Sequence, residues 1–226
     1  MAINVDRVET VTFDSFSTLV DVDSTARAVE PHVDDPIDFA RRWHSRAAVY
    51  GAIGNYIDAY ETYDDLHLDA LEYLLATEGV EVTRDELEEM NAVYHEMEPF
   101  EDVRSGIQQL IDAGYDVGVI SNGDPPMLDS LVRVADLDGL LEATVSADEI
   151  ERHKPAVELY EHAAARLDTD IEATMHVSNG VFDVQGAIHA GMQGVWLNRQ
   201  DAPPEPFGPE PDLTVESIDE LVARLG

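Results

Sequence analysis

The sequence of 226 residues contains no cysteine, which excludes disulfide bonds and any chemistry that needs a thiolate as nucleophile or metal ligand. It also lacks an apolar run long enough to cross a bilayer, which takes about 20 residues. Residues 1–6 contain neither a basic residue nor a long apolar segment, so they do not resemble a targeting signal. We therefore expect a cytoplasmic protein with no membrane partner.

Basic residues are scarce as well. One lysine and twelve arginines stand against 48 aspartates and glutamates, which gives a formal net charge of −35. Such a surface repels phosphate, so nucleic acid is excluded as a partner. The acidic residues are spread along the whole chain among periodic apolar segments, which argues against disorder. Acidity of this kind favours a halophilic source, because concentrated salt screens the repulsion between carboxylates.

The single lysine, Lys154, lies in the segment His153-Lys154-Pro155. A chain with so little lysine would keep an ammonium where a compact charge with three donors must hold a carboxylate or an oxyanion. A lysine that merely survives on the surface is equally compatible with the composition. The residues that surround Lys154 in the fold distinguish these two interpretations.

The apolar pattern of the first hundred residues predicts one strand followed by helices. The segment 8–13 alternates and is rich in β-branched residues, which predicts a strand that ends at Asp14. Residues 22–98 contain no convincing strand. Helical spacing predicts helices in this stretch, over residues 39–57 and 66–75 and, after the capping box Thr83-Arg84-Asp85-Glu86, to about Glu96.

From Val103 onward, predicted helices and strands alternate. The strands are expected at 115–120, 143–145, 175–177, 195–197 and 213–215, and the helices at 103–113, before Ala135, after Pro155, at 181–190 and at 217–225. This order predicts an α/β fold, with a Rossmann-like parallel sheet and helices on both of its faces. Residues 1–20 and 99–226 then form the core domain, and residues 21–98 form an inserted helical cap domain.

Polar residues gather where the predicted strands end. They are Asp14 after the first strand, Ser121 and Asn122 after the second, Lys154 in a later loop, and Ser178 with Asp183 after the strand 175–177. Ligands of open α/β sheets bind beyond the carboxyl ends of the strands, so we expect these side chains to meet in one crevice. The only lysine is among them.

These segments carry a family resemblance. The four motifs of the haloacid dehalogenase superfamily resemble Phe13-Asp14-Ser15-Phe16-Ser17-Thr18-Leu19, Ile120-Ser121-Asn122-Gly123, Lys154-Pro155 and Val177-Ser178-Asn179 through Asp183. The L-2-haloacid dehalogenases are also similar at Asp21-Val22, Tyr160, Gly186-Ala187 and Trp196-Leu197-Asn198-Arg199. The resemblance covers nearly the whole core and, more weakly, the cap.

Two positions separate dehalogenases from the phosphatases of this superfamily. A phosphatase carries a second aspartate two residues after the nucleophile, because an alkoxide leaving group needs a proton; here that residue is Phe16. It also binds Mg²⁺ through an acid at the start of the fourth motif; here that residue is Ser178. Halide leaves without a proton, and a 2-haloacid carries a single negative charge. Both replacements therefore favour dehalogenation.

The resemblance implies a hydrolase that displaces halide from a short 2-haloalkanoic acid through an aspartyl ester on Asp14, giving a 2-hydroxy acid without metal or cofactor. Lys154 would keep Asp14 ionised and oriented, while Asp183 would hold Lys154 and help to activate the hydrolytic water. The other implied roles are Ser121 and Thr18 as donors to Asp14, Asn122 for the departing halide, Ser178 for the substrate carboxylate, Phe16 beside the substrate, and Tyr160 as a supporting tyrosine or a core residue.

Two regions depart from the dehalogenase pattern. After Trp43, the cap arginine that helps to bind halide in the family is replaced by His44, which is shorter and only partly charged at neutral pH. Either His44 takes that place, or it is an ordinary cap residue and Arg41 on the same helical face substitutes. In the fourth motif the family's asparagine and tryptophan are replaced by Gly180 and Phe182. Phe182 lines an apolar pocket or packs in the core.

The sequence leaves two other classes of function open. One is a hydrolase that forms the same Asp14 ester on another small substrate, including a residual phosphatase. The other is a non-catalytic descendant that binds a small anion or a partner. A homodimer is implied by the resemblance alone.

The charge generates the first prediction. With a formal charge of −35, transfer from molar KCl to dilute buffer should expand or unfold the chain, because the Debye length grows from roughly 3 Å at 1 M to several times that value. Circular dichroism and the melting temperature, recorded across a KCl series, measure the effect. If neither changes with salt, the inference of a halophilic protein is wrong.

Overall fold

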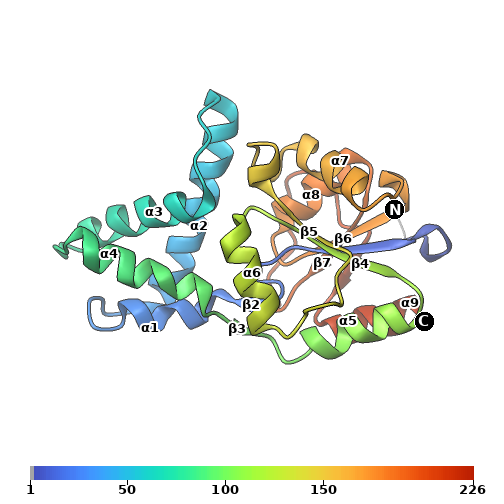
Figure 1. Cartoon of the computed structure of the whole chain (residues 1–226), viewed down its shortest axis with the longest axis horizontal. Helices are drawn as coiled ribbons and strands as arrows, with labels where there is room; N and C mark the ends of the chain where they lie inside the picture. Colours follow the sequence, from blue (N-terminus) through green and yellow to red (C-terminus); the bar gives the residue numbers. More distant parts are fainter. Residues whose placement is uncertain (1–2) are drawn as a thin grey trace.

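The computed structural model describes residues 3–226. Residues 1 and 2, which belong to the predicted core range 1–20 and to the amino-terminal segment 1–6, lie outside the described residues. One six-stranded sheet, in the order β5-β4-β1-β6-β7-β8, forms the centre of the larger half of the molecule (Figure 1). Its strands are β1 (Thr10–Phe13), β4 (Asp116–Ser121), β5 (Ala143–Ser146), β6 (Thr174–Ser178), β7 (Gln193–Leu197) and β8 (Leu213–Val215). All neighbouring strands run parallel.

Nine α-helices occur in the described part of the chain. They are α1 (Ala26–Val29), α2 (Pro36–Ile57), α3 (Tyr63–Thr77), α4 (Arg84–Asn91), α5 (Val103–Asp112), α6 (Pro125–Val134), α7 (Val157–Arg166), α8 (Val181–Ala190) and α9 (Ile218–Leu225). Short 3₁₀ helices lie at Val5–Arg7, Val22–Thr25, Ala92–His95, Ala147–Glu149 and Ile171–Ala173. A further pair of strands, β2 (Val20–Asp21) and β3 (Glu98–Pro99), pairs antiparallel.

The two faces of the sheet carry different helices (Figure 1). Helices α5 and α9 pack together on one face, and α7 and α8 cover the other. Strand β4 shows how the sequence specifies this: Val117 and Val119 belong to the main core, whereas Ile120 belongs to the cluster beneath α7 and α8. Side chains of a strand alternate between faces, so this continuous apolar run serves both layers.

The predicted α/β fold with a parallel sheet is confirmed, and every predicted strand and helix forms. The capping box is also present: Thr83 Oγ1 accepts from the Glu86 amide at 3.3 Å, and the Glu86 carboxylate accepts from the Thr83 amide at 2.7 Å. The sequence did not predict β2, β3 or α1. Elements of two to four residues are too short to show a period.

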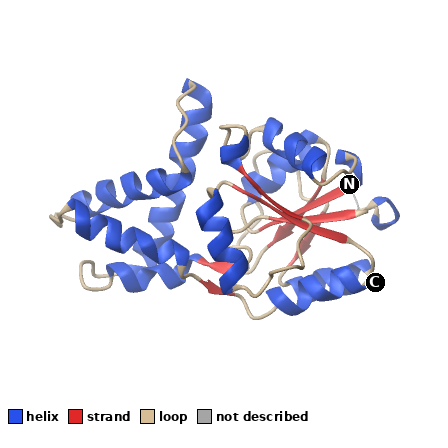
Figure 2. Cartoon of the chain, viewed as in Figure 1, coloured by secondary structure: helices blue, strands red, loops and turns tan. Residues whose placement is uncertain are grey.

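Helices α1 to α4 form a layer to the side of the sheet, between β2 and β3 along the chain (Figure 2). Trp43 on α2 is fully buried and donates through Nε1 to the carbonyl of His67 on α3 at 2.7 Å. The predicted domain boundaries, at residues 20–21 and 98–99, coincide with the β2–β3 pair. The division into core and cap stays a prediction.

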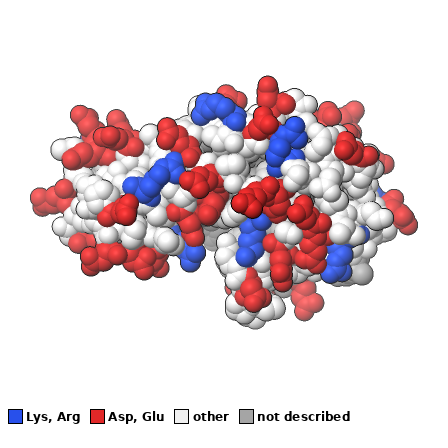
Figure 3. Space-filling model, turned by 90° about the horizontal axis from the view of Figure 1, so that it is seen from below, with Lys and Arg blue, Asp and Glu red and all other residues white. Residues whose placement is uncertain are grey.

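The surface is acidic. Figure 3 shows carboxylates distributed over the whole visible face, with isolated basic side chains among them. Many arginines are paired within the chain, such as Arg42, which lies 2.8 Å from both Asp38 and Glu78. Across residues 3–226, no helix combines the length and apolarity needed to span a membrane.

Arg199 connects the loop after β1 to the segment that follows the cap. Its guanidinium donates to the Thr18 carbonyl at 3.1 Å and to the Asp102 carboxylate at 2.9 Å, and it lies 4.1 Å from the Phe100 ring centroid. Asp102 in turn accepts from the Ile218 amide at the start of α9. Both charged side chains are nearly buried, so each depends on the other for neutralisation.

This geometry predicts that Arg199→Ala lowers the free energy of unfolding by about 3 kcal/mol, because it leaves Asp102 buried without its cation. Arg199→Lys should cost about half as much, since it keeps the charge and loses the planar fork. Arg224→Ala, which breaks an exposed pair with Glu220, is the control and should leave the free energy of unfolding almost unchanged. Denaturation in molar KCl measures all three. Equal losses for Arg199→Ala and Arg224→Ala would contradict the assignment.

Candidate active site

The site lies at the carboxyl end of the central strand. Strand β1 is flanked by β4 and β6, so the sheet order reverses around it and the ends of all three strands face one crevice. Asp14 follows β1 directly, and its amide donates to the carbonyl of Val177 on β6 at 2.9 Å. The crevice predicted from the polar strand ends is therefore present in the fold.

Lys154 bridges two carboxylates. Its Nζ lies 3.0 Å from Asp14 Oδ1 and 2.9 Å from Asp183 Oδ2, and the lysine side chain is only 6% exposed. Burial opposes the charge on Lys154, but Asp14 and Asp183 outweigh it and raise the pKa of the ammonium above its ordinary value. The interpretation of Lys154 as a surviving surface residue is therefore wrong.

A tight turn brings a second donor to Asp14. Ser17 has a φ of 61°, in the left-handed region that few side chains adopt without a local constraint. The turn places Thr18 so that its hydroxyl donates to Asp14 Oδ2 at 2.9 Å, while Thr18 Oγ1 itself accepts from the Asn179 amide at 2.9 Å. Both carboxylate oxygens of Asp14 are thus oriented by hydrogen bonds, as the sequence predicted for Lys154 and Thr18.

Ser121 does not contact the Asp14 carboxylate, and the prediction that it donates there is wrong. Its hydroxyl lies 2.6 Å from the Ser15 hydroxyl and accepts from the Gly123 amide at 2.9 Å. Ser15 follows Asp14 in the loop after β1 and is fully buried. Ser121 therefore fixes the loop that carries the nucleophile position and does not touch its oxygens.

Asp183 is held by three donors. Besides Lys154, its carboxylate accepts from the Tyr160 hydroxyl at 2.6 Å and contacts His176 Nε2 at 3.1 Å. Burial alone would raise its pKa, but Lys154, His176 and Tyr160 together hold the pKa of Asp183 well below its usual range. Tyr160 is both fully buried in the core and bonded to Asp183, so the two interpretations of this residue hold together.

Sequence reasoning missed His176. It is fully buried on β6, and its second nitrogen, Nδ1, lies 3.0 Å from the Thr12 hydroxyl on β1. The signal was a histidine inside an otherwise apolar strand, since a buried imidazole needs partners for both nitrogens. A histidine that faces a carboxylate must carry its proton on that nitrogen, so His176 donates to Asp183 through Nε2.

Two further strand-end residues present donors to the crevice. Asn122 Oδ1 accepts from the Lys154 amide at 2.7 Å, which turns the amide nitrogen toward Tyr63, with which it forms a hydrogen bond. Ser178 Oγ accepts from the Gly180 amide at 3.0 Å, leaving its hydroxyl hydrogen free to donate. Helix α8 begins beside it without a side-chain cap, so its first amides also face an anion favourably.

A cavity of about 860 Å³ connects these groups with the cap. One end of the cavity is lined by Asp14, Lys154, Asp183, Asn122 and Ser178. On the cap side, helix α2 lines the cavity. Phe182 lines the cavity with 55% of its side chain exposed, so it is not a core residue. Phe16 also lines it but is 5% exposed, with its ring centroid 5.8 Å from that of His44.

His44 lines the cavity and Arg41 does not. Arg41 turns to the surface, where its guanidinium binds both carboxylate oxygens of Asp23 at 2.8 and 2.5 Å. The alternative in which Arg41 substitutes for the family's cap arginine is therefore wrong. Burial lowers the pKa of His44 to about 4, despite the opposing effect of the Asp14 carboxylate, so the ring is neutral at pH 7.

The hydrogen positions on His44 follow from its neighbour. His67 Nδ1 lies 2.8 Å from the Tyr63 carbonyl, which only accepts, so the proton of this buried neutral ring is on Nδ1. His67 Nε2 is then an acceptor for His44 Nδ1, at 3.4 Å. The remaining nitrogen of His44, Nε2, carries no proton and has no partner among the described residues. The cap thus offers a lone pair at the place where the family resemblance implied a cation.

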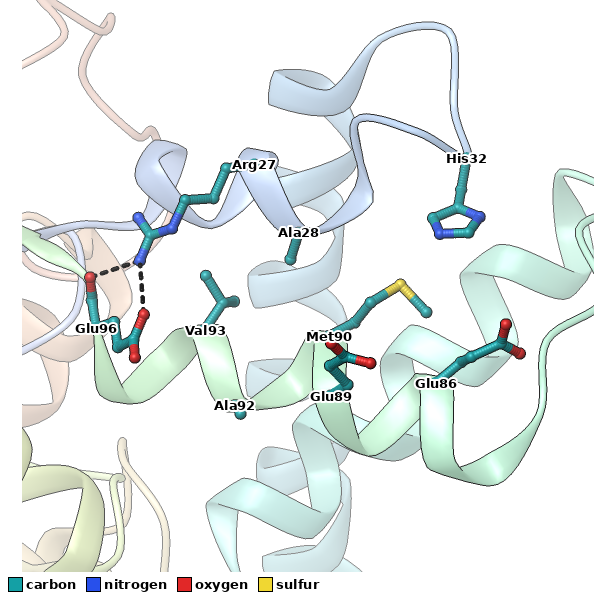
Figure 4. Close-up of a pocket in the computed structure, with 9 residues that line it drawn as sticks. All are labelled: Arg27, Ala28, His32, Glu86, Glu89, Met90, Ala92, Val93 and Glu96. Carbon is teal, nitrogen blue, oxygen red and sulfur yellow. Dashed lines mark hydrogen bonds and ion pairs between the residues drawn. The ribbon is translucent and has the colours of Figure 1, made fainter.

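Within residues 3–226, no group of three or more His, Asp or Glu side chains is arranged to hold a metal ion. A second hollow, of about 580 Å³, lies in the cap near α1 and α4 (Figure 4). Arg27 and Glu96 close one side of it through an ion pair and a bond from Arg27 to the Glu96 carbonyl. None of the predicted catalytic or substrate-binding residues lines this hollow.

The lowered pKa of His44 predicts a pH-dependent stability. The unfolded chain binds a proton near pH 6.5 and the folded chain only near pH 4, so acidification through this range favours unfolding. Between pH 7.5 and pH 5, His44→Gln should therefore lose about 1–2 kcal/mol less unfolding free energy than the parent protein. Urea denaturation in molar KCl at the two pH values measures the difference.

The matched control for this experiment is His32→Gln, which removes an exposed histidine that does not line the cavity. It should retain the full loss of the parent protein. Identical pH dependence in His44→Gln and His32→Gln would contradict the burial of an uncharged His44.

The comparisons with known proteins agree with this geometry. A family model described as haloacid dehalogenase-like hydrolase matches residues 8–191. (S)-2-haloacid dehalogenase 4A of Burkholderia cepacia is 29% identical over 202 residues, which cover 89% of this chain and 87% of that protein. (S)-2-haloacid dehalogenase 1 of Pseudomonas sp. (strain CBS-3) is 28% identical over 228 residues, 98% of this chain and 99% of that protein.

Solved structures share the whole fold. A dehalogenase matches with a TM-score of 0.91 and 29% identity, covering 98% of both chains. A dehalogenase with an intermediate complex matches with a TM-score of 0.89 and 28% identity, covering 96% of this chain and 97% of that one. With the family model spanning most of the sequence and the motif residues gathered at one strand-end crevice, the chain belongs to the haloacid dehalogenase-like hydrolases.

Proposed function

We propose that the protein is an (S)-2-haloacid dehalogenase that replaces the halogen at C2 of a 2-haloalkanoic acid by a hydroxyl group. The observation that carries this proposal is Asp14, oriented by Lys154 and Thr18 at the floor of the cavity. The dehalogenases similar to this chain, one of them solved with an intermediate complex, support the same chemistry.

The reaction proceeds in two displacement steps. A carboxylate oxygen of Asp14 attacks C2, and the carbon–halogen bond breaks with its electron pair leaving on the halide. Water then adds to the carboxyl carbon of the Asp14 ester, which releases the 2-hydroxy acid and restores the carboxylate. One proton and one halide ion are released for each water consumed. Asp183, held beside Lys154, assists the approach of that water.

The substrate carboxylate has a place at the amino end of α8. The uncapped first amides of the helix and the free hydroxyl hydrogen of Ser178 provide donors to an anion there. The cluster of Asp14, Asp183 and Lys154 carries a net negative charge, so these neutral donors supply the attraction that the charged groups do not.

The departing halide lies on the cap side. The amide nitrogen of Asn122 is oriented toward it by the bond between Asn122 Oδ1 and the Lys154 amide. The rings of Phe16 and Tyr63 exclude water from the same region. His44, neutral at pH 7, limits the stabilisation of halide compared with a permanent cation.

The replacements at Phe16 and Ser178 favour this reaction over phosphate-ester hydrolysis and support catalysis without a metal ion. We propose, further, a cytoplasmic protein from a halophilic source without a nucleic-acid partner, supported by the charge of −35. We also propose a core of residues 1–20 and 99–226 with a cap of residues 21–98, supported by the β2–β3 pair. The family resemblance supports a homodimer.

Isotope labelling tests the nucleophile. In a single turnover of 2-chloropropionate with excess enzyme in ¹⁸O-water, the label should enter the Asp14 carboxylate and not the hydroxy acid, because the new hydroxyl oxygen comes from Asp14. Asp14→Asn should lower turnover by about 10⁴-fold or more, and Lys154→Met by about 10²–10³-fold. Arg41→Ala, which removes a surface pair near the same helix face, is the control and should retain full activity.

Label found directly in the product would show that water attacks C2 and would demote Asp14 to a general base. The same assay in EDTA should proceed at an unchanged rate, since Ser178 replaces the acid that would bind Mg²⁺. Loss of activity in EDTA, with cleavage of phosphate esters after Mg²⁺ is restored, would instead support a phosphatase.

A further inference from the structure

We propose that the substrate carries a long apolar chain on C2, which lies along the cavity between α2 and the loop that carries Phe207. This inference rests on the proposed function and names the class of 2-haloacid that the site takes. Three features of the cavity, independent of the catalytic residues, lead to it: its volume, the composition of its two walls, and the way its outer aromatic ring is fixed.

The cavity is far larger than a short substrate. A three-carbon 2-haloacid has six heavy atoms and occupies on the order of 180 Å³, taking about 30 Å³ for each water-sized group. The cavity measures about 860 Å³, within the range that encloses ligands several times larger. With the carboxylate at α8 and C2 at Asp14, most of this volume stays unfilled, and Gly180 and Phe182 are among the residues that line it. Gly180 contributes to this space, since a Cβ there would meet no atom closer than 3.5 Å.

On the cap side, the small side chains of α2 that line this space are apolar except for Ser45. Helix α2 presents Ala48, Val49 and Ala52 to the cavity, and positions 44, 48 and 52 follow one another on a single helical face. Along α2, the lining therefore changes from the ring of His44, beside the reacting groups, to alanine methyl groups farther out. Side chains this small leave a channel beside the helix.

Away from the reacting end, the described part of the cavity lining contains no Asp, Glu, Lys or Arg side chain. Asp14, Asp183 and Lys154 are the only Asp, Glu, Lys or Arg side chains among the described residues that line the cavity. The other polar side chains of the lining, among them Ser45, Gln185 and His189, add no carboxylate, although the whole chain has 48 acidic residues among 226. An exposed apolar patch rimmed by charge is typical of a surface that binds an apolar group.

The core wall ends in two exposed aromatic rings. Phe182 on α8 is 55% exposed and Phe207 is 72% exposed, and both line the cavity. The Phe207 carbonyl accepts a hydrogen bond from Gln185 Nε2, which ties the loop to α8. Prolines within residues 203–211 limit the conformations of this loop further. Phe207 is therefore presented to the cavity by a restrained backbone.

Paired substrates test the inference. Racemic 2-bromooctanoate has five more methylene groups than 2-bromopropionate, and burial of each, in a cavity open on one side, should improve kcat/KM about twofold. We expect a kcat/KM about 30-fold higher for 2-bromooctanoate, measured as bromide release in molar KCl. Equal values, or a preference for 2-bromopropionate, would overturn the inference and leave the proposed dehalogenase function intact.

Three variants test where the alkyl chain of the substrate lies. Phe207→Ala should lower kcat/KM for 2-bromooctanoate about 5-fold and leave 2-bromopropionate unchanged. Ala52→Leu, which keeps a strong helix former, should fill the channel and have the same selective effect. Tyr56→Ala removes a ring that is 93% exposed on α2 and does not line the cavity, so it is the matched control and should alter neither value. Loss of activity toward both acids in Phe207→Ala and Ala52→Leu would contradict the placement.

A binding measurement separates this inference from the proposed function. Titration calorimetry with Asp14→Asn, using octanoate and propionate as unreactive acids, should show octanoate binding about 30-fold more tightly. Absence of halide release from both bromo acids, together with tight octanoate binding, would reject the dehalogenase function and retain the apolar channel. Equal binding of octanoate and propionate would reject the channel itself, whatever the reaction.

Discussion

The ammonium of Lys154 between Asp14 and Asp183 is the interaction on which the site depends. Two carboxylates lie within 3.0 Å of one buried cation, on side chains 15% and 11% exposed. Without that cation the carboxylates would repel one another in a region where water cannot screen them. Neighbouring side chains supply the remaining hydrogen bonds: His176 and Tyr160 donate to the Asp183 carboxylate, whereas Thr18 donates to the Asp14 carboxylate. Asp14 and Asp183 both line the cavity, but three side-chain donors hold Asp183 and only two hold Asp14, so Asp14 is the carboxylate more available to react.

The arrangement of the two carboxylates explains why residue 154 is a lysine and not an arginine. Elsewhere the chain uses arginine, and arginines such as Arg199 and Arg41 bind a carboxylate with a planar fork. Lys154 instead contacts two carboxylates on different elements, one after β1 and one on α8, which a compact ammonium reaches without a preferred plane. A chain with a formal charge of −35 thus retains its single lysine where the geometry, and not the charge alone, requires it.

Local patterns were sufficient to predict the strands of the main sheet, the helices other than α1, and the crevice. Each strand of the core has its own apolar run, and the carboxyl ends of parallel strands necessarily share one edge of the sheet. The partners within the crevice were less predictable. Ser121 turns to Ser15, and Arg41 turns to Asp23, because these choices depend on side-chain direction and on neighbours far along the chain. His176 was missed for the same reason, since its partners Thr12 and Asp183 come from two other elements.

The core and the cap contribute different kinds of surface to the cavity. The core supplies the charged groups, the amides of α8 and the rings of Phe182 and Phe207, whereas the cap supplies the ring of Tyr63, a neutral histidine and the small side chains of α2. A neutral His44 with an unprotonated Nε2 gives the cap no strong hold on a halide or a carboxylate. Binding energy from that side must therefore come from apolar contact. The charged triad determines which bond is broken, and the cap determines which substrate is held long enough for it to break.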